Sequence, residues 1–465
     1  MSHEPRGEYL ASSDARPVGY TQRVSYAASD TAGQLLFTVI SFYLLKFYTD
    51  IAGLSALVAG NILLIARFVD SLDAPLWGIV FEKVHSKWGK SRPWFLWLCV
   101  PFALSGIATF ATPDLSRANE ALYAAATYIV CSVLYTGINT PVTAILSALT
   151  SDARQRVVLT TYRMFGSKAG VLIVNATLLP CIAWFGRGDD KLGIMRTIPI
   201  YAAGSIVLYL VAFRHLRERI PAAAGRVSIG KSFSAINGNG PWIIIVSSSL
   251  LFWIAFIARI STVPYFFEYV WHRNDLVPLA NSLDVVSLAA LSFLPWMCRR
   301  TSKRNIWACG LAGALGSQFL LYAGICSGSQ ALLFTGWISG ILTSGVAMAM
   351  PFSLLADSVD YGEWKTGVRA AGLLTAIGAA FCLKVGSGLG GALPAWIFAA
   401  TDYHANVGQN SRALAGIVFA FVWLPGIFYA LALLPVMFYE RYERLEPLIA
   451  ETLRSRRAAA GSLSE

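Results

Sequence analysis

Long apolar segments alternate with short polar ones along the whole chain, and this alternation predicts membrane-spanning helices. Twelve of the segments have about twenty mostly apolar residues, the length that crosses the hydrocarbon core of a bilayer. They lie near residues 31–49, 54–80, 94–112, 120–148, 157–185, 197–214, 241–263, 276–297, 305–326, 329–355, 371–399 and 412–439. We therefore expect an all-α membrane protein with twelve transmembrane helices.

The polar loops divide these spans into two similar halves of six. The longest polar stretch follows the sixth span, basic loops follow spans two and eight, and acidic or mixed loops follow spans four and ten. Such weak internal symmetry is typical of transporters whose substrate site lies near the midplane. We expect two pseudo-symmetric six-helix halves at residues 31–214 and 241–439, joined by a cytoplasmic middle loop at 215–240. Cytoplasmic tails are expected at residues 1–30 and 440–465.

The distribution of charge predicts the orientation of the chain. Charged residues make up 14% of the sequence, against about 25% in a soluble domain, and the net charge is +11. Most Lys and Arg residues lie in loops on one side of the spans, so they indicate topology and not a nucleic-acid surface. We expect a multi-pass protein of the inner (plasma) membrane with both termini cytoplasmic.

Other classes of protein find little support. Residues 1–29 are polar, so the first span, and not a cleavable signal peptide, is expected to direct insertion. The seven cysteines and five histidines are scattered, and no nucleophile elbow, phosphate loop or zinc signature is present. We therefore expect no catalytic residues, no metal site and no enzymatic activity.

The second span carries an unusual set of charges. Arg67, Asp70, Asp73 and Trp77 are three, three and four residues apart, which places them on one face of a helix. A charged side chain at the bilayer centre costs roughly 2.5–3.5 kcal/mol, so this face is expected to look into protein or water and to have a function. We predict that Asp70 is the main cation-coupling group and Asp73 its partner. The alternative is a structural ion pair between Arg67 and Asp70.

Two lysines in the spans are further candidates. Lys384 is followed by four glycines at 386, 388, 390 and 391, which allow close helix approach, so we expect Lys384 to reach Asp70 as its counter-charge. Its alternative is to extend to the membrane interface. Lys168 either replaces a metal ion electrostatically or extends to the interface in the same way.

Polar residues within the spans are candidates for sugar binding, because sugars present hydroxyl groups together with apolar C–H faces. Tyr135 and Asn139 are four residues apart on span four, Asp284 lies on span eight and Trp337 on span ten. Such residues also serve as helix–helix contacts worth about 0.6 kcal/mol each. Arg259 is expected either to pair with Asp284 or to bind an acidic sugar such as a hexuronide.

Several motifs resemble those of one family, the glycoside–pentoside–hexuronide cation symporters, which include the melibiose carrier and belong to the major facilitator superfamily. The strings that carry the resemblance are RFVDSLDAPLWG with SKWGKSRPW, FYTDIAGLS, TYRMFGS, ADSVDYGEWKTGVRAAGLLTA and FCLKVGSGLGGAL. The resemblance covers all twelve spans. It implies the major facilitator fold and the symport of sugars or glycosides with sodium, lithium or protons.

Residue by residue, the resemblance implies three roles. Asp70 matches the first cation-site aspartate of the family, Arg163 its fifth-span arginine, and Lys384 its eleventh-span lysine. The resemblance thereby adds Arg163 to the substrate-binding candidates.

The chain also departs from the family pattern. Ala74 stands where the family has its second aspartate, although Asp73 lies one position earlier. Asn139 and Gln34 stand where the melibiose carrier has further aspartates, so both become substrate-binding candidates. Sodium prefers several hard oxygen ligands, whereas a proton needs only one titratable group. We therefore expect proton coupling in preference to sodium coupling, with no cofactor beyond the co-transported ion.

The predicted cytoplasmic loops carry charges of both signs. By pseudo-symmetry, these charges are expected to form ion pairs between helix ends when the cytoplasmic side is shut and to separate when it opens. The gating candidates are Lys87, Lys90, Arg92, Asp357, Asp360 and Arg369. The tail after Tyr439 is expected to form either a short interfacial helix or a solvated tail.

Together these observations predict a secondary active transporter that works by alternating access as a monomer in the lipid bilayer. Its substrates are expected to be a sugar, glycoside or hexuronide and a monovalent cation. The alternatives are a sodium-dependent lysophospholipid-type lipid carrier of the same fold and a membrane sugar sensor that does not transport.

Overall fold

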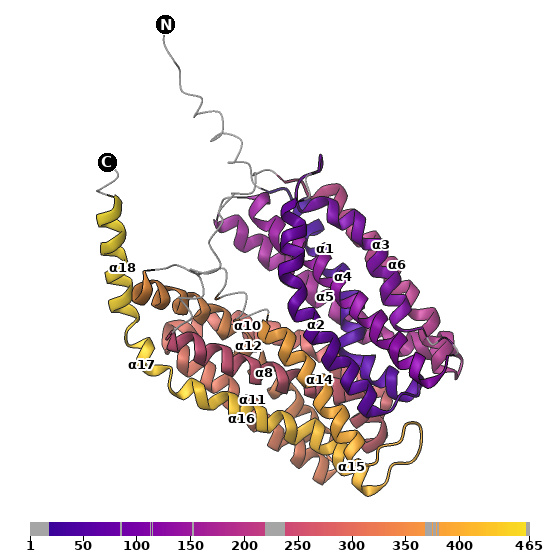
Figure 1. Cartoon of the computed structure of the whole chain (residues 1–465). Helices are drawn as coiled ribbons and strands as arrows, with labels where there is room; N and C mark the ends of the chain where they lie inside the picture. The colour runs from indigo at the N-terminus through magenta and orange to yellow at the C-terminus, as the bar shows by residue number, and fades with distance from the viewer. Residues whose placement is uncertain are drawn as a thin grey trace. The chain divides into compact units, whose positions relative to one another are not determined.

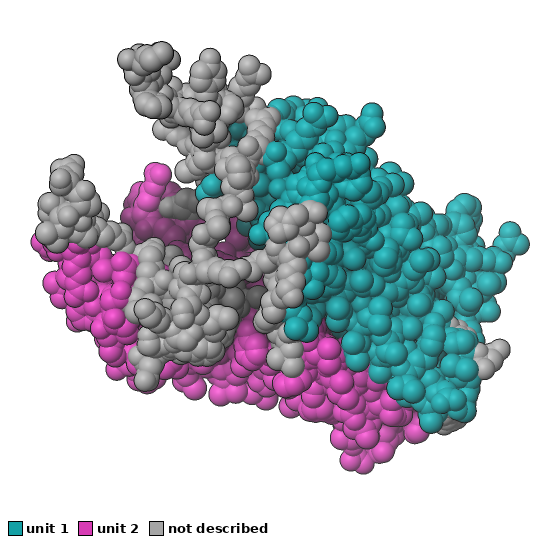
Figure 2. Space-filling view, turned by 45° about the horizontal axis from the view of Figure 1, so that its top comes forward, with its two compact units in different colours: residues 1–54, 72–224 teal, residues 55–71, 225–465 magenta. Residues whose placement is uncertain are grey.

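The computed structural model describes residues 18–83, 86–111, 113, 115–150, 153–218, 238–367, 374, 378 and 381–461, and these contain helices and no strand. They form two compact units, shown in different colours in Figure 2. Unit 1 consists of residues 1–54 and 72–224, and unit 2 of residues 55–71 and 225–465. The predicted division into halves stays a prediction, from which these units depart chiefly at residues 55–71.

The helices follow one another along the chain in the order of their labels in Figure 1. Unit 1 contains α1 (Tyr20–Lys46), η1 (Phe47–Ile51), the second part of α2 (Ala56–Lys83), α3 (Arg92–Thr109), α4 (Arg117–Leu149), α5 (Ala153–Gly186) and α6 (Asp190–His215). Unit 2 contains the first part of α2, then α8 (Gly240–Tyr265), η2 (Phe266–Val270), η3 (Asn274–Leu276), α9 (Val277–Ser282), η4 (Leu283–Val286), α10 (Ser287–Arg300), α11 (Lys303–Ser327), α12 (Gln330–Thr366), α14 (Cys382–Ala400), α15 (Ser411–Val418), η6 (Phe419–Trp423), α16 (Leu424–Met437), α17 (Glu440–Glu443) and α18 (Glu446–Gly461).

The helices overlap the predicted spans but often differ from them at their ends, and the start of the span at 371–399 lies largely outside the described residues. Within the described part of the chain, nine helices are long and apolar enough to cross a membrane. Helices α1 to α3 are not among them, because polar or charged residues lower the hydropathy of α1 and α3, and α2 carries Arg67, Asp70 and Asp73. The span predicted at 276–297 is not one regular helix, because the 3-10 segment η4 separates α9 from α10.

Glycines let the helices pack closely within each unit. In unit 1, α5 packs on α1, and a Cβ atom on Gly170 would lie 2.7 Å from Cβ of Gln34. In unit 2, α14 packs on α8, and a Cβ atom on Gly390 would lie 2.8 Å from the Ile254 carbonyl oxygen. Small residues of this kind are common where membrane helices approach closely. The glycines after Lys384 thus have the packing role that the sequence predicts.

The first helix of each predicted half ends in the same way. Helix α1 passes into the π-helical turn η1, and α8 passes into the π-helical turn η2. Each turn is five residues long. Turns of this type are rare in proteins, and those that occur often lie at functional sites. The two repeats predicted from the loops therefore also share a local backbone feature.

The C-terminal tail is helical and packs on unit 2. Helix α18 contacts α12 and buries Ile449 and Leu453. Beside it, Nζ of Lys303 lies 2.6 Å from Oδ2 of Asp357 and 3.3 Å from Oε2 of Glu446. Of the two expectations for this tail, the structure favours an ordered helix over a solvated segment.

Candidate functional site

Asp70 lies between two cationic side chains within unit 2. Its Oδ1 atom is 3.2 Å from Nζ of Lys384, and its Oδ2 atom is 3.5 Å from Nη1 of Arg67. Lys384 also donates a hydrogen bond to the backbone carbonyl of Asp70. The contact between Asp70 and Lys384 that the sequence predicts is therefore found. The carboxylate is buried, since the Asp70 side chain is 3% exposed.

Small residues bring these charges together. The first part of α2 lies against α14, where a Cβ atom on Gly388 would lie 2.7 Å from Cβ of Arg67. Nearby, Trp396 donates a hydrogen bond of 3.0 Å to the Asn61 side chain. Any larger residue at position 388 would push α14 away from α2, and with it the ammonium group of Lys384. The local sequence KVGSGLGG therefore sets the distance between Lys384 and Asp70.

The charged face of α2 is buried, as predicted. Arg67, Asp70 and Asp73 are 8%, 3% and 4% exposed, respectively, whereas Phe68 and Leu76 on the same helix are exposed. Polar side chains that face protein while apolar ones face outward are the arrangement expected of a functional membrane helix. Asp73 falls in unit 1, and its role as the partner of Asp70 stays a prediction.

A second charged cluster lies in unit 1 and centres on Arg163 of α5. Its Nε atom is 3.3 Å from Oδ1 of Asp30 on α1, and its Nη1 atom donates a 3.0 Å hydrogen bond to Thr143 on α4. Tyr26, one turn before Asp30, adjoins the same guanidinium group. The sequence reasoning missed Asp30, because it placed residues 1–30 in a polar tail. Helix α1 begins instead at Tyr20.

The sugar-binding candidates of unit 1 extend from this cluster. The rings of Tyr135 and Phe37 stack with centroids 4.6 Å apart. Asn139, which is half-buried, lies on α4 between Tyr135 and Thr143. On α1, Gln34 accepts a 3.4 Å hydrogen bond from Thr38. Helices α1, α4 and α5 thus bring an aromatic surface and several polar groups into one unit.

In unit 2, Arg259 of α8 is almost completely buried. Its guanidinium group lies 4.9 Å from the ring of Trp337, an arrangement that stabilises a cation. The indole N–H of Trp337 donates a 2.7 Å hydrogen bond to the Ala280 carbonyl. Among the described residues, Nε and Nη1 of Arg259 have no acceptor, and the predicted ion pair with Asp284 is not found. Asp284 lies half-buried in η4.

Two of the gating candidates form side-chain contacts within their own units. Asp357 pairs with Lys303, and Arg92 donates hydrogen bonds to the carbonyls of Phe213 and Arg214. Lys87 lies over the Trp88 ring, and the backbone N–H of Lys90 donates a hydrogen bond to Glu218. Asp360 is half-buried, and Arg369 lies outside the described residues. Lys168 is half-buried on α5, and both expectations for it stay open.

The comparison with known families agrees with this architecture. The sequence pattern of one family, described as "MFS/sugar transport protein", matches residues 25–441. The chain belongs to this family. Membership confirms the predicted resemblance, the all-α major facilitator fold and a function in transport as opposed to catalysis.

Several relatives match over nearly their whole length. The isoprimeverose transporter of Lactiplantibacillus pentosus is 36% identical over 96% of this chain and 94% of its own. The inner membrane symporter YicJ of Escherichia coli (strain K12) is 28% identical over 88% of this chain and 89% of its own. The glucuronide carrier protein homolog of the same organism is 28% identical over 90% of this chain and 91% of its own. The predicted class, cation-coupled sugar symport by a multi-pass membrane protein, is confirmed by these relatives together with the family.

Solved structures show the same fold at low sequence identity. A crystal structure of a D-xylose-proton symporter has a TM-score of 0.62 and 16% identity, over 89% of this chain and 97% of that one. A bacterial homolog of the human lysosomal transporter Spinster has a TM-score of 0.66 and 11% identity, over 96% of this chain and 99% of that one. At these identities the likeness establishes the fold alone.

Proposed function

We propose that the protein couples the uptake of a neutral, pentose-containing glycoside to that of protons, with Asp70 as the group that carries the proton. The observation that supports this best is the position of Asp70 between Lys384 and Arg67, at 3.2 and 3.5 Å. The protein acts as a monomer in the inner membrane with both termini cytoplasmic. A reporter protein fused to the C-terminus, active only in the cytoplasm, tests this orientation.

The single carboxylate of Asp70, held between two cations, suits a proton better than a metal ion. A proton that binds Asp70 neutralises the carboxylate, and its charge-assisted hydrogen bonds with Lys384 and Arg67 weaken. Both cations repel any positive ion, but a proton needs only this one carboxylate, whereas a sodium ion prefers several oxygen ligands. Proton binding therefore alters the contact between α2 and α14, and such a contact provides the two-state element that alternating access requires.

The substrate proposal rests on the polar and aromatic groups of unit 1. Tyr135 and Phe37 offer an apolar ring surface, while Gln34, Asn139 and Arg163 offer donors and acceptors for sugar hydroxyl groups. The name of the isoprimeverose transporter, 36% identical to this chain, supports a glycoside that contains a pentose.

Transport into proteoliposomes tests the proposal. Purified protein is placed in sodium-free liposomes that contain a pH-sensitive dye, and isoprimeverose, xylose, melibiose and a glucuronide are added in turn. We expect acidification of the lumen with isoprimeverose, and its loss in Asp70→Asn. The matched control is Asp275→Asn, which removes an exposed carboxylate that pairs with Arg273.

The outcomes separate the parts of the proposal. Sugar uptake that needs added sodium and leaves the lumenal pH unchanged would exclude proton coupling. Uptake of a lysophospholipid with no uptake of any sugar would favour the lipid carrier. Sugar binding without uptake by any of these routes would indicate a sensor.

A second candidate substrate class is an acidic glycoside, which the burial of Arg259 favours. Its Nε and Nη1 atoms are without an acceptor among the described residues, and a buried donor that finds no partner is costly. One of the relatives is named as a glucuronide carrier protein homolog. If this class is right, Arg259→Gln will reduce uptake of a glucuronide at least tenfold and leave that of a neutral xyloside nearly unchanged.

A further inference from the structure

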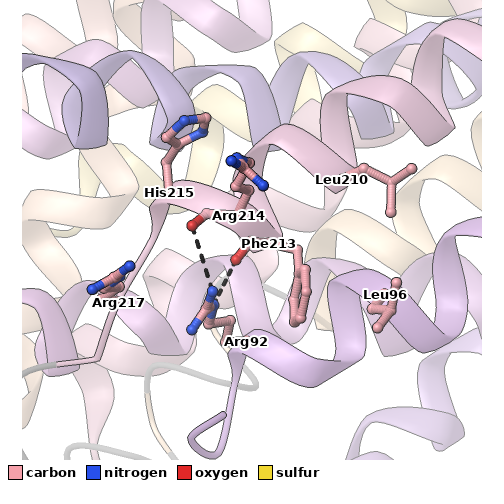
Figure 3. A pocket seen from close by; sticks show the side chains of 7 residues that line it. All are labelled: Arg92, Leu96, Leu210, Phe213, Arg214, His215 and Arg217. Carbon is pink, nitrogen blue, oxygen red and sulfur yellow. Dashed lines mark hydrogen bonds between the residues drawn. The ribbon is translucent and has the colours of Figure 1, made fainter.

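A pocket of about 710 Å³ lies in unit 1 where α3 begins and α6 ends. It is lined by Arg92, Leu96, Leu210, Phe213, Arg214, His215 and Arg217. Figure 3 shows that the basic side chains gather toward one end of this pocket and that Leu96 and Leu210 lie toward the other. The lining is therefore amphipathic, cationic at one end and apolar at the other.

Hydrogen bonds hold the pocket in shape. The Glu218 carboxylate accepts hydrogen bonds from the backbone N–H groups of Lys90, Ser91 and Arg92, at 2.9, 2.6 and 3.0 Å. These bonds fix the chain after α6 against the start of α3. Arg92 also donates to the Phe213 carbonyl, and its guanidinium group lies 4.7 Å from the Phe213 ring. The walls are therefore built by specific contacts between two helices.

Three arginines line the pocket, and Glu218 is an acidic residue that the structure places beside them. Arg214 and Arg217 are exposed and form no ion pair among the described residues. The nearby carboxylate of Glu218 already accepts three backbone hydrogen bonds at the start of α3. A ligand with a negative charge would therefore find cationic donors available here.

The pocket lies at the level expected for lipid headgroups. Helix α6 is a candidate membrane span, and its outer surface exposes large apolar side chains such as Val207 and Leu210. The span ends at His215, immediately beside Arg214 and before Arg217. The basic loops also place this end of α6 on the predicted cytoplasmic side. Basic pockets at this depth on that side of a membrane protein bind anionic lipid headgroups.

We propose that this pocket binds an anionic phospholipid, such as phosphatidylglycerol. Arg214 and Arg217 contact the phosphate group, while Leu96, Leu210 and Phe213 contact the first part of the acyl chains. A free phosphate ion has the same charged group as the lipid headgroup, but it has no apolar part that could contact the apolar end of the pocket. The site is independent of Asp70 and of the sugar that the protein carries.

Lipid retention tests the proposal on the full-length protein. Wild-type protein and Arg214→Gln/Arg217→Gln are placed in nanodiscs that contain equal amounts of phosphatidylglycerol and phosphatidylcholine, and native mass spectrometry counts the lipids that each protein retains. The matched control is Arg299→Gln/Arg300→Gln, which removes two exposed arginines at the end of α10. We expect the wild type and the control to retain at least one phosphatidylglycerol molecule that Arg214→Gln/Arg217→Gln loses. The affinity of this variant for phosphatidylglycerol should be about fivefold lower, or lower still.

Three results would overturn the proposal. The first is equal retention by the wild type and Arg214→Gln/Arg217→Gln, and the second is an equal loss in the control, which would indicate a general effect of charge. The third is complete displacement of the retained lipid by millimolar inorganic phosphate, which would indicate a phosphate site. If the double variant does not fold, Arg217→Gln alone replaces it, since Arg217 lies beyond the end of α6.

Discussion

Nζ of Lys384 lies 3.2 Å from Oδ1 of Asp70, although 314 residues separate them in sequence. The contact joins α14 to the first part of α2, and these segments belong to the same compact unit. Arg67 binds the other carboxylate oxygen at 3.5 Å. A proton that bound Asp70 would therefore weaken the contact between α2 and α14.

Removing Asp70 should destabilise the protein more than removing Lys384. Asp70→Asn leaves Lys384 and Arg67 without the carboxylate between them, which typically costs about 3 kcal/mol, whereas Lys384→Gln leaves Asp70 paired with Arg67. The double variant Asp70→Asn/Lys384→Gln completes the cycle. Unfolding of the purified protein, followed by circular dichroism, measures both effects. We expect a coupling energy of about 1–3 kcal/mol between the two substitutions. Strict additivity would show that the contact contributes nothing to stability.

Asp30 and Arg163 should act as a unit in substrate binding. Asp30→Asn frees the guanidinium group to leave its position beside Thr143, so we expect weaker sugar binding, by roughly tenfold or about 1.4 kcal/mol. Isothermal titration calorimetry measures this affinity. The double variant Asp30→Asn/Arg163→Gln should bind no more weakly than Arg163→Gln alone. An affinity equal to that of the wild type in Asp30→Asn would make the pair purely structural.

Gly388 should not tolerate even one additional carbon atom. Gly388→Ala would place a Cβ atom 2.7 Å from Cβ of Arg67, and overpacking of this kind costs about 1–3 kcal/mol. Thermal unfolding measures the loss. The control is Gly316→Ala in α11, where the new Cβ would meet nothing within 4 Å. We expect Gly316→Ala to be neutral or stabilising, and equal destabilisation by both variants would contradict the packing argument.

The attachment of α18 should weaken as the pH rises. Burial, followed by the nearby Asp357 carboxylate, raises the pKa of Glu446 above its ordinary value of 4.5, although Lys303 acts in the opposite direction. The docked helix therefore binds this proton more tightly than an unfolded tail does. Its additional stability is present below pH 4.5 and is lost as the pH rises through the raised pKa.

Hydrogen exchange of the α18 amides between pH 4 and 8, corrected for the intrinsic rate, measures this effect. We expect Glu446→Gln to remove the dependence on pH and Glu451→Gln, at an exposed position of the same helix, to retain it. Protection that grows with pH in the wild type would contradict the assigned direction.

Much of the fold follows from the sequence, because a span needs about twenty apolar residues wherever it occurs. That constraint is local, so the pattern of the chain predicted the spans, while their grouping into two halves stays a prediction. It also indicated Asp70 and Lys384, since an ionised group in a bilayer is costly enough to need a partner. Boundaries were less well determined. Helix α1 begins at Tyr20 within the predicted tail, and Asp30 was missed for that reason.

The tertiary structure alone decided which charged groups meet. No sequence motif contains Arg259, and only the packing of α8 against α12 places its guanidinium group over Trp337, without the predicted ion pair to Asp284. Likewise, Asp357 has Lys303 as its partner because α11 and α12 pack side by side. Hydrophobic pattern fixes what must be buried, whereas the partner of a buried charge depends on the contacts between helices that are distant in sequence.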